Sequence, residues 1–264
     1  MERDPERIKS LYETDDYIAK NPTLHEEDSP WKLEKIFPFV DRFSSLHSNP
    51  EVNLLDVGGG AGLILKETSC YLASRGRAVR KYALDLSPGM LEIQKRNNPD
   101  LFRAVNGDIT RTPFADKEID LMLLIDIIEH VPSAPDALRE IARISRYALF
   151  KVPLDENLFY KTQNFLEKGR LRRWAVETLG HVNTYAYGGL KRQIEAHAGK
   201  VLQHSFTNAA RYALRPEVKE KNRQTRWGRF ENRVNLAASG VHAVSPRLAS
   251  LLFNDFAMVL VECR

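Results

Sequence analysis

Short apolar runs alternate with amphipathic helical patterns between Val52 and Leu154. The runs are VNLLDV (52–57), AVRKYALDL (78–86), LFRAVNGDI (101–109), EIDLMLLIDII (118–128) and YALFKVPL (147–154). Several of them are apolar at consecutive positions, which is typical of strands buried on both faces of a parallel sheet. Helical patterns lie between them at 63–76, 87–97 and 134–146, and the third connection is weak. The alternation predicts an α/β protein with a doubly wound sheet.

The pattern changes on both sides of this region. Apolar residues recur at helical spacing in 8–20 and 29–46, which indicates an N-terminal helical cap or lid over residues 1–50. Residues 51–264 are predicted to form one domain, in which a helix (187–199) and strands at 200–208 and 254–263 bring the sheet to seven strands. Long insertions at about 155–186 and 208–250 separate these elements, and insertions of such length on a compact sheet are usually functional or disordered.

Composition adds little beyond solubility and compartment. Hydrophobic residues make up 43% and charged residues 28% of the 264 residues, with a net charge of +4. Cys70 and Cys263 are far apart, and no signal-peptide pattern is seen, so we expect free, buried thiols in a cytoplasmic protein. No apolar stretch reaches the roughly 20 residues of a membrane span.

Positive charge is concentrated in 208–250, where nine Arg or Lys stand against three Glu. A solvated helix face is one interpretation, and an acidic acceptor or a nucleic acid bound by this segment is the other. Nucleic acid is disfavoured because the basic residues are interleaved with Glu and no stacking aromatics form a stripe with them.

The stretch LLDVGGGAGL (54–63) places glycines between the first predicted strand and a helix. Such a turn lets a ligand approach bare backbone at a helix N-terminus, although a packing turn without a ligand is the alternative. The spacing of Gly58, Gly60 and Gly62 is G-x-G-x-G, whereas the dinucleotide fingerprint is G-x-G-x-x-G. Asp56 would also repel a pyrophosphate. The pattern therefore favours a ligand without phosphates.

Four motifs in order, LDVGGGAG, ALDLSPGML, NGDI and IDIIEHV, resemble those of the class I S-adenosylmethionine-dependent methyltransferases. The resemblance is strong over Val52–Leu154 and weak in the last helix and strands. It implies a Rossmann-like, seven-stranded, mostly parallel sheet with helices on both faces. It also implies S-adenosylmethionine as the cofactor and S-adenosylhomocysteine as its product.

The resemblance further implies a role for each residue of the motifs. The methionine end of the cofactor would lie on Asp56 and the backbone of Gly58, Gly59, Gly60 and Gly62. Asp85 would accept hydrogen bonds from the ribose hydroxyls. The adenine would lie among Leu86, Met90, Asp108 and Ile109, and Asp126 would line the methyl-transfer mouth. Purely structural roles remain open for Asp85 and Asp126 as helix caps and for Asp108 as a turn former.

Methyl transfer to a hydroxyl needs alignment and removal of a proton. The candidates for catalysis are His181 and His130, with Asp126 at the mouth; His130 is alternatively a helix-start histidine bonded to backbone. We expect no metal ion, because Asp126 is followed by apolar residues without a partner set. Cytosine C5 chemistry is excluded by the positions of the cysteines, and adenine N-methylation by the absence of an Asn/Asp-Pro-Pro-aromatic turn.

The two insertions suggest the nature of the acceptor. Aromatic residues of the first insertion are expected to shape an apolar pocket, or else to form a satellite cluster: Phe159, Tyr160, Phe165, Trp174, Tyr185 and Tyr187. Arginines are expected to meet an acidic group on the acceptor: Arg170, Arg172, Arg173, Arg211, Arg215 and Arg226. The sequence therefore predicts methyl transfer to a small molecule, most directly to a hydroxyl oxygen. The alternatives are an inactive cofactor-binding regulatory module and an RNA methyltransferase that uses the basic segment. The oligomeric state is left open.

Overall fold

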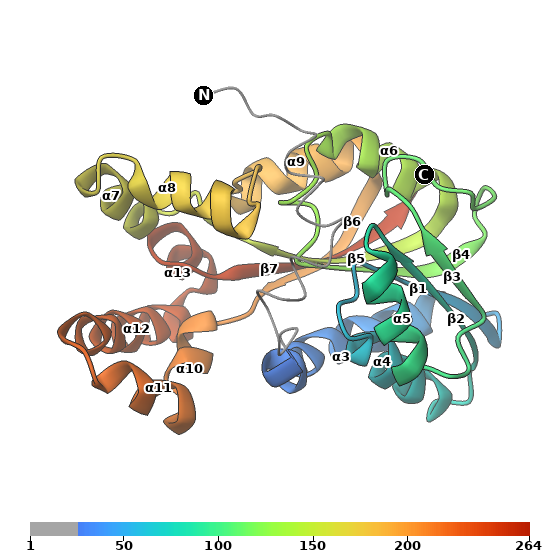
Figure 1. The fold of residues 1–264 in the computed structure, drawn as a ribbon, viewed down its shortest axis with the longest axis horizontal. Coiled ribbons are helices and arrows are strands. Elements are labelled where there is room, and N and C mark those ends of the chain that lie inside the picture. Colours follow the sequence, from blue (N-terminus) through green and yellow to red (C-terminus); the bar gives the residue numbers. More distant parts are fainter. Residues whose placement is uncertain (1–25) are drawn as a thin grey trace.

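The computed structural model of the protein describes residues 26–264, and a seven-stranded sheet forms its centre (Figure 1). The strands are β1 (Glu51–Val57), β2 (Ala78–Asp85), β3 (Arg103–Asn106), β4 (Ile119–Ile125), β5 (Ser145–Pro153), β6 (Gly199–Phe206) and β7 (Phe256–Cys263). Their order is β3-β2-β1-β4-β5-β7-β6, and β7 runs antiparallel to both of its neighbours. The predicted doubly wound, mostly parallel sheet is confirmed.

The order of the strands reverses between β1 and β4, which are neighbours in the sheet although β2 and β3 separate them in sequence. Asp56 pairs in register with Ala83 of β2 on one side and Leu123 of β4 on the other. The carboxyl ends of three central strands therefore meet at one edge. In open α/β sheets, ligands bind at such a switch point.

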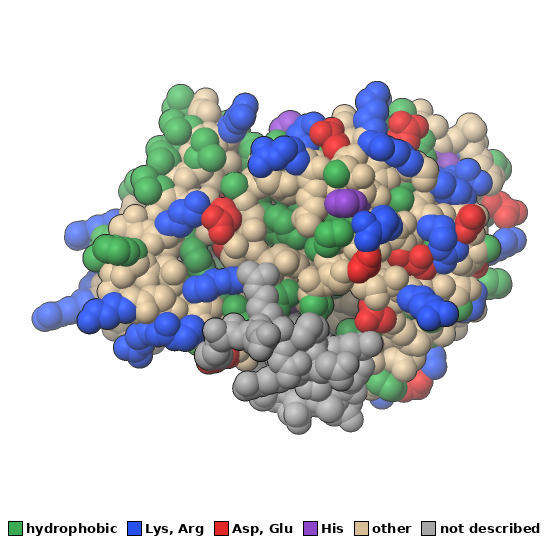
Figure 2. Space-filling view, turned by 90° about the horizontal axis from the view of Figure 1, so that it is seen from above, with side chains coloured by type: hydrophobic (Ala, Val, Ile, Leu, Met, Phe, Trp, Pro, Cys, Tyr) green, Lys and Arg blue, Asp and Glu red, His purple; other side chains and the backbone are tan. Residues whose placement is uncertain are grey.

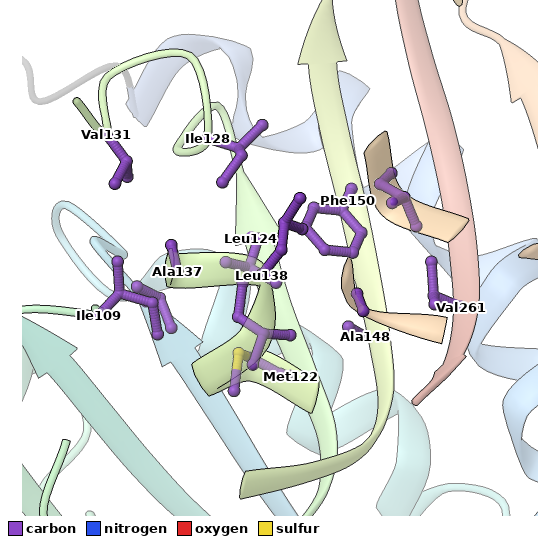
Figure 3. Close-up of a cluster of buried hydrophobic side chains, with 14 of the residues drawn as sticks. Ile109, Met122, Leu124, Ile128, Val131, Ala137, Leu138, Ala148, Phe150 and Val261 are labelled. Carbon is purple, nitrogen blue, oxygen red and sulfur yellow. The ribbon is translucent and has the colours of Figure 1, made fainter. Parts of the chain in front are cut away.

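Helices cover both faces because side chains alternate along each strand. The helices of the sheet region are α3 (Ser29–Leu46), α4 (Leu63–Ala73), α5 (Pro88–Asn97), α6 (Ala134–Ile144) and α9 (Tyr187–His197). Met122 and Leu124 of β4 pack in one core with Leu138 of α6 (Figure 3). Leu121 and Leu123, one position out of phase, pack in the other with residues of α3 and α4.

The predicted N-terminal cap is only partly within the described residues. The helical pattern at 8–20 lies outside them, and a short 3₁₀ turn, η1 (Glu26–Asp28), precedes α3. α3 buries Ile36, Phe39 and Phe43 at 0–2% exposure against the sheet and α4. This helix is therefore an integral part of one core layer.

The two insertions are helical. They comprise α7 (Leu158–Leu166), α8 (Arg170–Trp174) and the π-helical turn η2 (Ala175–Leu179), then α10 (Ala209–Ala213), α11 (Pro216–Arg223), α12 (Arg226–Val244) and α13 (Pro246–Leu252). Figure 1 shows α7, α8 and α10 to α13 gathered at one end of the molecule. Lys and Arg side chains and hydrophobic side chains share the surface at that end (Figure 2).

Three details differ from or extend the sequence interpretation. The third connection, between β3 and β4, contains no helix. Both thiols are free, as predicted. Cys263 is half-buried, but Cys70 is exposed, whereas the sequence predicted that it is buried. Among residues 26–264, no helix combines the length and the apolar character that crossing a bilayer requires.

Candidate active site

A cavity of about 730 Å³ opens at the carboxyl ends of β1, β2, β4 and β5. Its walls include the glycine turn after β1, the first turn of α3, the loop after β4 and residues of α10. The four sequence motifs, which are far apart along the chain, all contribute residues to it. The switch point of the sheet is thus a hollow, as the topology predicts.

The glycine turn has a backbone that other residues would not fit. Gly58 and Gly60 have φ angles of 60° and 53°, in the left-handed region that favours glycine. A Cβ on Gly59 would stand 2.3 Å from Oδ2 of Asp56, and one on Gly58 would stand 2.5 Å from Cδ1 of Ile127. The turn therefore exposes its main chain to the cavity.

Gly62 has a different role from the other glycines. It is the residue before α4, at φ 77°, and a Cβ there would stand 2.8 Å from Nδ2 of Asn98. It does not line the cavity. Close packing against Asn98, which follows α5, therefore accounts for the glycine at this position.

Asp56 is the most unusual polar residue of this edge. Its side chain is 1% exposed, and Oδ2 has no hydrogen-bond partner among the described residues. Burial, and next the negative charge of Asp85, raise the pKa of Asp56 to about 7. A buried carboxylate oxygen without a partner is costly, so the site is suited to a ligand that brings a positive charge or a hydrogen-bond donor.

Asp85 is held in one orientation at the end of β2. Its Oδ1 accepts a hydrogen bond from the backbone nitrogen of Ser87 (2.9 Å) and its Oδ2 accepts one from Nε2 of Gln94 (3.2 Å). Burial raises the pKa of Asp85 to about 6. The cap of α5 is Ser87, whose Oγ accepts from the backbone nitrogen of Met90 at 3.1 Å. The side chain of Asp85 is therefore not the helix cap, and it lines the cavity.

Asp108 combines two roles. Its Oδ1 accepts hydrogen bonds from the backbone nitrogen and the hydroxyl of Thr110, at 2.9 and 2.8 Å, which is the turn predicted as the structural alternative. It also lines the cavity, together with Leu86, Met90 and Ile109. The residues expected around an adenine are thus brought together.

Asp126 follows β4 and is held by two lysines. Its φ is 60°, which is uncommon for a residue other than glycine, and its backbone nitrogen donates to the carbonyl of Lys151 at 2.9 Å. Its carboxylate lies 2.5 Å from Nζ of Lys151 and 3.3 Å from Nζ of Lys32. Burial alone would raise the pKa of Asp126, but the charges of Lys151 and Lys32 outweigh burial and lower it. The side chain is therefore a fixed anion within a cationic pair.

Lys151 is itself surrounded by aromatic rings. It is 1% exposed, its Nζ lies 3.5 Å from the ring centre of Phe256, and the ring of Trp31 is 5.6 Å away. Trp31 also contacts Tyr212 and Phe256, with ring centres 4.7 and 6.0 Å apart. We call Trp31, Tyr212 and Phe256 the aromatic wall; all three line the cavity.

The residues that the sequence proposed for an acceptor pocket do not line this cavity. None of the six aromatic residues proposed from the first insertion lines the cavity: Phe159, Tyr160, Phe165, Trp174, Tyr185 and Tyr187. Phe165 is 82% exposed and Tyr185 lies in the core. The six proposed arginines are also absent from the lining: Arg170, Arg172, Arg173, Arg211, Arg215 and Arg226. The cations that line it are Lys32 and Lys151.

The two histidines meet at the mouth, as expected of neighbours in the site. The ring centres of His130 and His181 are 4.9 Å apart, and Nδ1 of His181 lies 3.2 Å from Oδ2 of Asp155. Burial, and next the charge of His181, lower the pKa of His130 to about 4. A backbone hydrogen bond with Gly180 opposes this shift, so the bond to backbone considered for His130 is present.

The loop that carries His181 is fixed by long side chains. Arg172 donates to the carbonyl oxygens of His181 (2.7 Å) and Val182 (2.9 Å). Asn183 donates to those of Ile128 (3.0 Å) and Val131 (2.7 Å) in the loop after β4. Arg172 therefore holds the loop that carries His181 at the mouth of the cavity.

Sequence reasoning missed several residues that line or support the site: Trp31, Lys32, Glu129, Lys151, Asp155, Tyr212 and Phe256. Lys151 carried a readable signal, since it is the single charge in the apolar run YALFKVPL. Glu129 lies within the motif IDIIEHV, and nothing in the local sequence distinguishes the other residues as part of a site.

A family model described as a methyltransferase domain matches residues 55–147. Over these residues the chain is similar to methyltransferases, the class that the four sequence motifs resemble.

The curated relatives are methyltransferases whose names give different substrates. A demethylmenaquinone methyltransferase of Beutenbergia cavernae is 28% identical over 146 residues, which cover 55% of this chain and 56% of that protein. A malonyl-[acyl-carrier protein] O-methyltransferase of Serratia marcescens is 31% identical over 99 residues, which cover 38% of this chain and 36% of that protein. The chain thus spans about half the length, or less, of these curated relatives.

Solved structures share the fold. The geranyl diphosphate C-methyltransferase of Streptomyces coelicolor A3(2), solved with Mg²⁺, geranyl diphosphate and S-adenosyl-L-homocysteine, superposes with a TM-score of 0.55 at 11% identity. The match covers 86% of this chain and 77% of that one. At this identity the likeness establishes the fold.

Proposed function

We propose that the protein transfers a methyl group from S-adenosylmethionine to a small-molecule acceptor, most directly to a hydroxyl oxygen. The observation that carries the proposal is the glycine turn over Asp56. A main chain without side chains faces a buried carboxylate oxygen that has no partner among the described residues. S-adenosylmethionine carries an ammonium group and no phosphate, and both properties suit a site built around the buried carboxylate of Asp56.

The residues present fit the cofactor along the whole edge. Asp56 and the main chain of Gly58, Gly59 and Gly60 would hold the methionine end, and Asp85 the ribose hydroxyls. Leu86, Met90, Asp108 and Ile109 would surround the adenine. When bound, the cofactor supplies an electrophilic methyl group on a sulfonium sulfur. The protein's task is then to align the acceptor and exclude water, and alignment is worth roughly 7 to 11 kcal/mol of barrier.

The acceptor is proposed to lie against the aromatic wall. Flat rings are held well by the faces of Trp31 and Tyr212, and Lys32, whose side chain is 13% exposed, offers a cation to an acidic group. A planar acceptor with a carboxylate or similar anion therefore suits the pocket best. The lining differs from the one predicted by sequence, yet it has the same chemistry.

His181 is the proposed acceptor of the hydroxyl proton. With Nδ1 protonated and directed at Asp155, the neutral ring keeps a lone pair on Nε2. His130 stays neutral at physiological pH because its pKa is about 4. Asp126, held between two lysines, is proposed to fix the shape of the mouth.

Calorimetry and thermal shift with S-adenosylhomocysteine test the cofactor site. A ligand at 100 times its dissociation constant stabilises by about 2.7 kcal/mol. We expect stabilisation by S-adenosylhomocysteine and none by NAD. Asp85→Asn should weaken binding, and Asp116→Asn, a change at an exposed carboxylate that does not line the cavity, should leave it unchanged. Stabilisation by NAD alone would overturn the proposal.

Catalysis is tested separately by mass-spectrometric detection of a methylated product from planar, acidic hydroxyl compounds and from RNA. A cofactor-binding regulatory module would bind S-adenosylhomocysteine and give no product from any acceptor. Product from RNA alone would favour the basic segment as the acceptor site.

A further inference from the structure

Glu129 has a buried carboxylate that the proposed methyl transfer does not use. The residue is 0% exposed, lines the cavity, and neither Oε1 nor Oε2 has a hydrogen-bond partner among the described residues. A carboxylate in this position must take up a proton or a cation.

Two imidazoles lie within reach of this carboxylate. One ligand atom each from Glu129, His130 and His181 lie within 4.8 Å of one another, and Nε2 of His130 is 3.8 Å from Oε1 of Glu129. Ligands bound at about 2.1 Å around a tetrahedral ion are roughly 3.4 Å apart. A modest closure of the three side chains therefore gives the separation that a bound ion requires.

The surroundings of the histidines match those of metal ligands. The ring centres of His130 and His181 are 4.9 Å apart, and both residues line the cavity beside Glu129. Asp155 accepts a hydrogen bond from Nδ1 of His181, which leaves the lone pair of the ring on Nε2. A carboxylate behind a histidine is the usual outer support of a metal-binding imidazole.

We propose that Glu129, His130 and His181 bind one divalent transition-metal ion at the mouth of the cavity. Two nitrogens and one carboxylate oxygen are suited to Zn²⁺, Mn²⁺ or Co²⁺ and poorly suited to Mg²⁺. Three protein ligands leave a position open, as in catalytic rather than structural metal sites. This inference replaces the expectation that the site holds no metal.

The consequence for the acceptor rests on the proposed function, whereas the ion site itself does not. A hydroxyl that occupies the open position would lose its proton at a lower pH. The Nε2 lone pair of His181 would then bind the metal ion and would not accept the hydroxyl proton. Metal binding without cofactor distinguishes these two roles.

The test uses the full chain, stripped with a chelator and dialysed, and titrated calorimetrically with ZnCl₂ and MnCl₂. Co²⁺ absorption in the visible range reports the ligand environment. We expect one ion per chain with little heat from MgCl₂. Glu129→Gln and His181→Asn should each weaken Zn²⁺ binding at least tenfold. Asp155→Asn, which removes only the outer support, should weaken it about 10 to 100-fold.

His197→Asn is the matched control, since His197 lies outside the cavity and contacts Arg139. It should bind Zn²⁺ as the unmodified protein does. The proposal is overturned if the unmodified chain binds no ion, or if Glu129→Gln and His181→Asn bind it as tightly. Circular dichroism and S-adenosylhomocysteine affinity, measured on the same samples, separate a lost ion site from a lost fold or cofactor site. Should Glu129→Gln fail to fold, His181→Asn at its partly exposed position decides the outcome alone.

Discussion

Cofactor affinity should depend on pH through Asp56. The pKa of this buried carboxyl is about 7, so a fall in pH protonates it within an accessible range. The protonated form offers no charge to an ammonium group. Binding should therefore weaken as pH falls through 7, and level off above it.

The magnitude follows from the fraction of Asp56 that is ionised. That fraction is about one half at pH 7 and about 3% at pH 5.5, which corresponds to a roughly 16-fold weaker apparent affinity. Asp85, with a pKa of about 6, adds a factor of about four over the same range if its charge is also required. The expected loss is thus between about 16-fold and 60-fold.

The assay is calorimetric titration of S-adenosylhomocysteine between pH 5.5 and 7.5 at constant ionic strength. Asp56→Asn should bind more weakly at pH 7.5 and retain only the shallower dependence of Asp85. Because the raised pKa marks a carboxylate that destabilises the protein when ionised without a ligand, this variant should also melt at a higher temperature at pH 7.5. Two results would refute the reasoning: an affinity of the unmodified protein that stays constant over this range, or the same pH slope in Asp56→Asn.

Other substitutions separate the parts of the site. Gly59→Ala should weaken S-adenosylhomocysteine binding at least about tenfold, because the added methyl group would stand 2.3 Å from Oδ2 of Asp56. The control is Gly189→Ala, where the added methyl group has open space around it. Lys151→Met should lower the free energy of unfolding, measured by chemical denaturation, by about 2 kcal/mol. This loss is smaller than the usual cost of breaking a buried ion pair, because Asp126 still pairs with Lys32. Tyr212→Leu should raise the acceptor KM about 2 to 12-fold with cofactor affinity unchanged, measured by steady-state kinetics.

The central sheet could be predicted from the sequence because its strands are apolar at consecutive positions. Residues 119–125 are buried along almost their whole length, so the pattern there reports burial on both faces directly. The glycine spacing and the acids at the ends of β1 and β2 were also predictable from the sequence, because each lies directly at the end of a recognisable strand. The connection between β3 and β4 has only a weak pattern in the sequence, and it contains no helix in the structure.

The acceptor side of the cavity was not readable in the same way. An aromatic residue at helical spacing is compatible with the core, with the surface and with a cavity wall. Phe165 and Trp174 proved to be exposed, whereas Trp31 and Phe256, in a helix and a strand more than 200 positions apart, form the wall. Such a contact depends on how α3 packs against β7, which the periodicity of neither segment encodes.

Lys151 shows which irregularity in a pattern carries functional information. A lysine in a run that is otherwise buried requires a counter-charge, because an unpaired ammonium in the core is too costly. Its register in β5 places it beside Ile125, the last residue of β4, and the next residue along the chain is the acid Asp126. From the strand pairing alone, Lys151 and Asp126 are therefore expected to meet. The chain must bend at Asp126 for the pair to form, and the left-handed backbone found there satisfies this requirement.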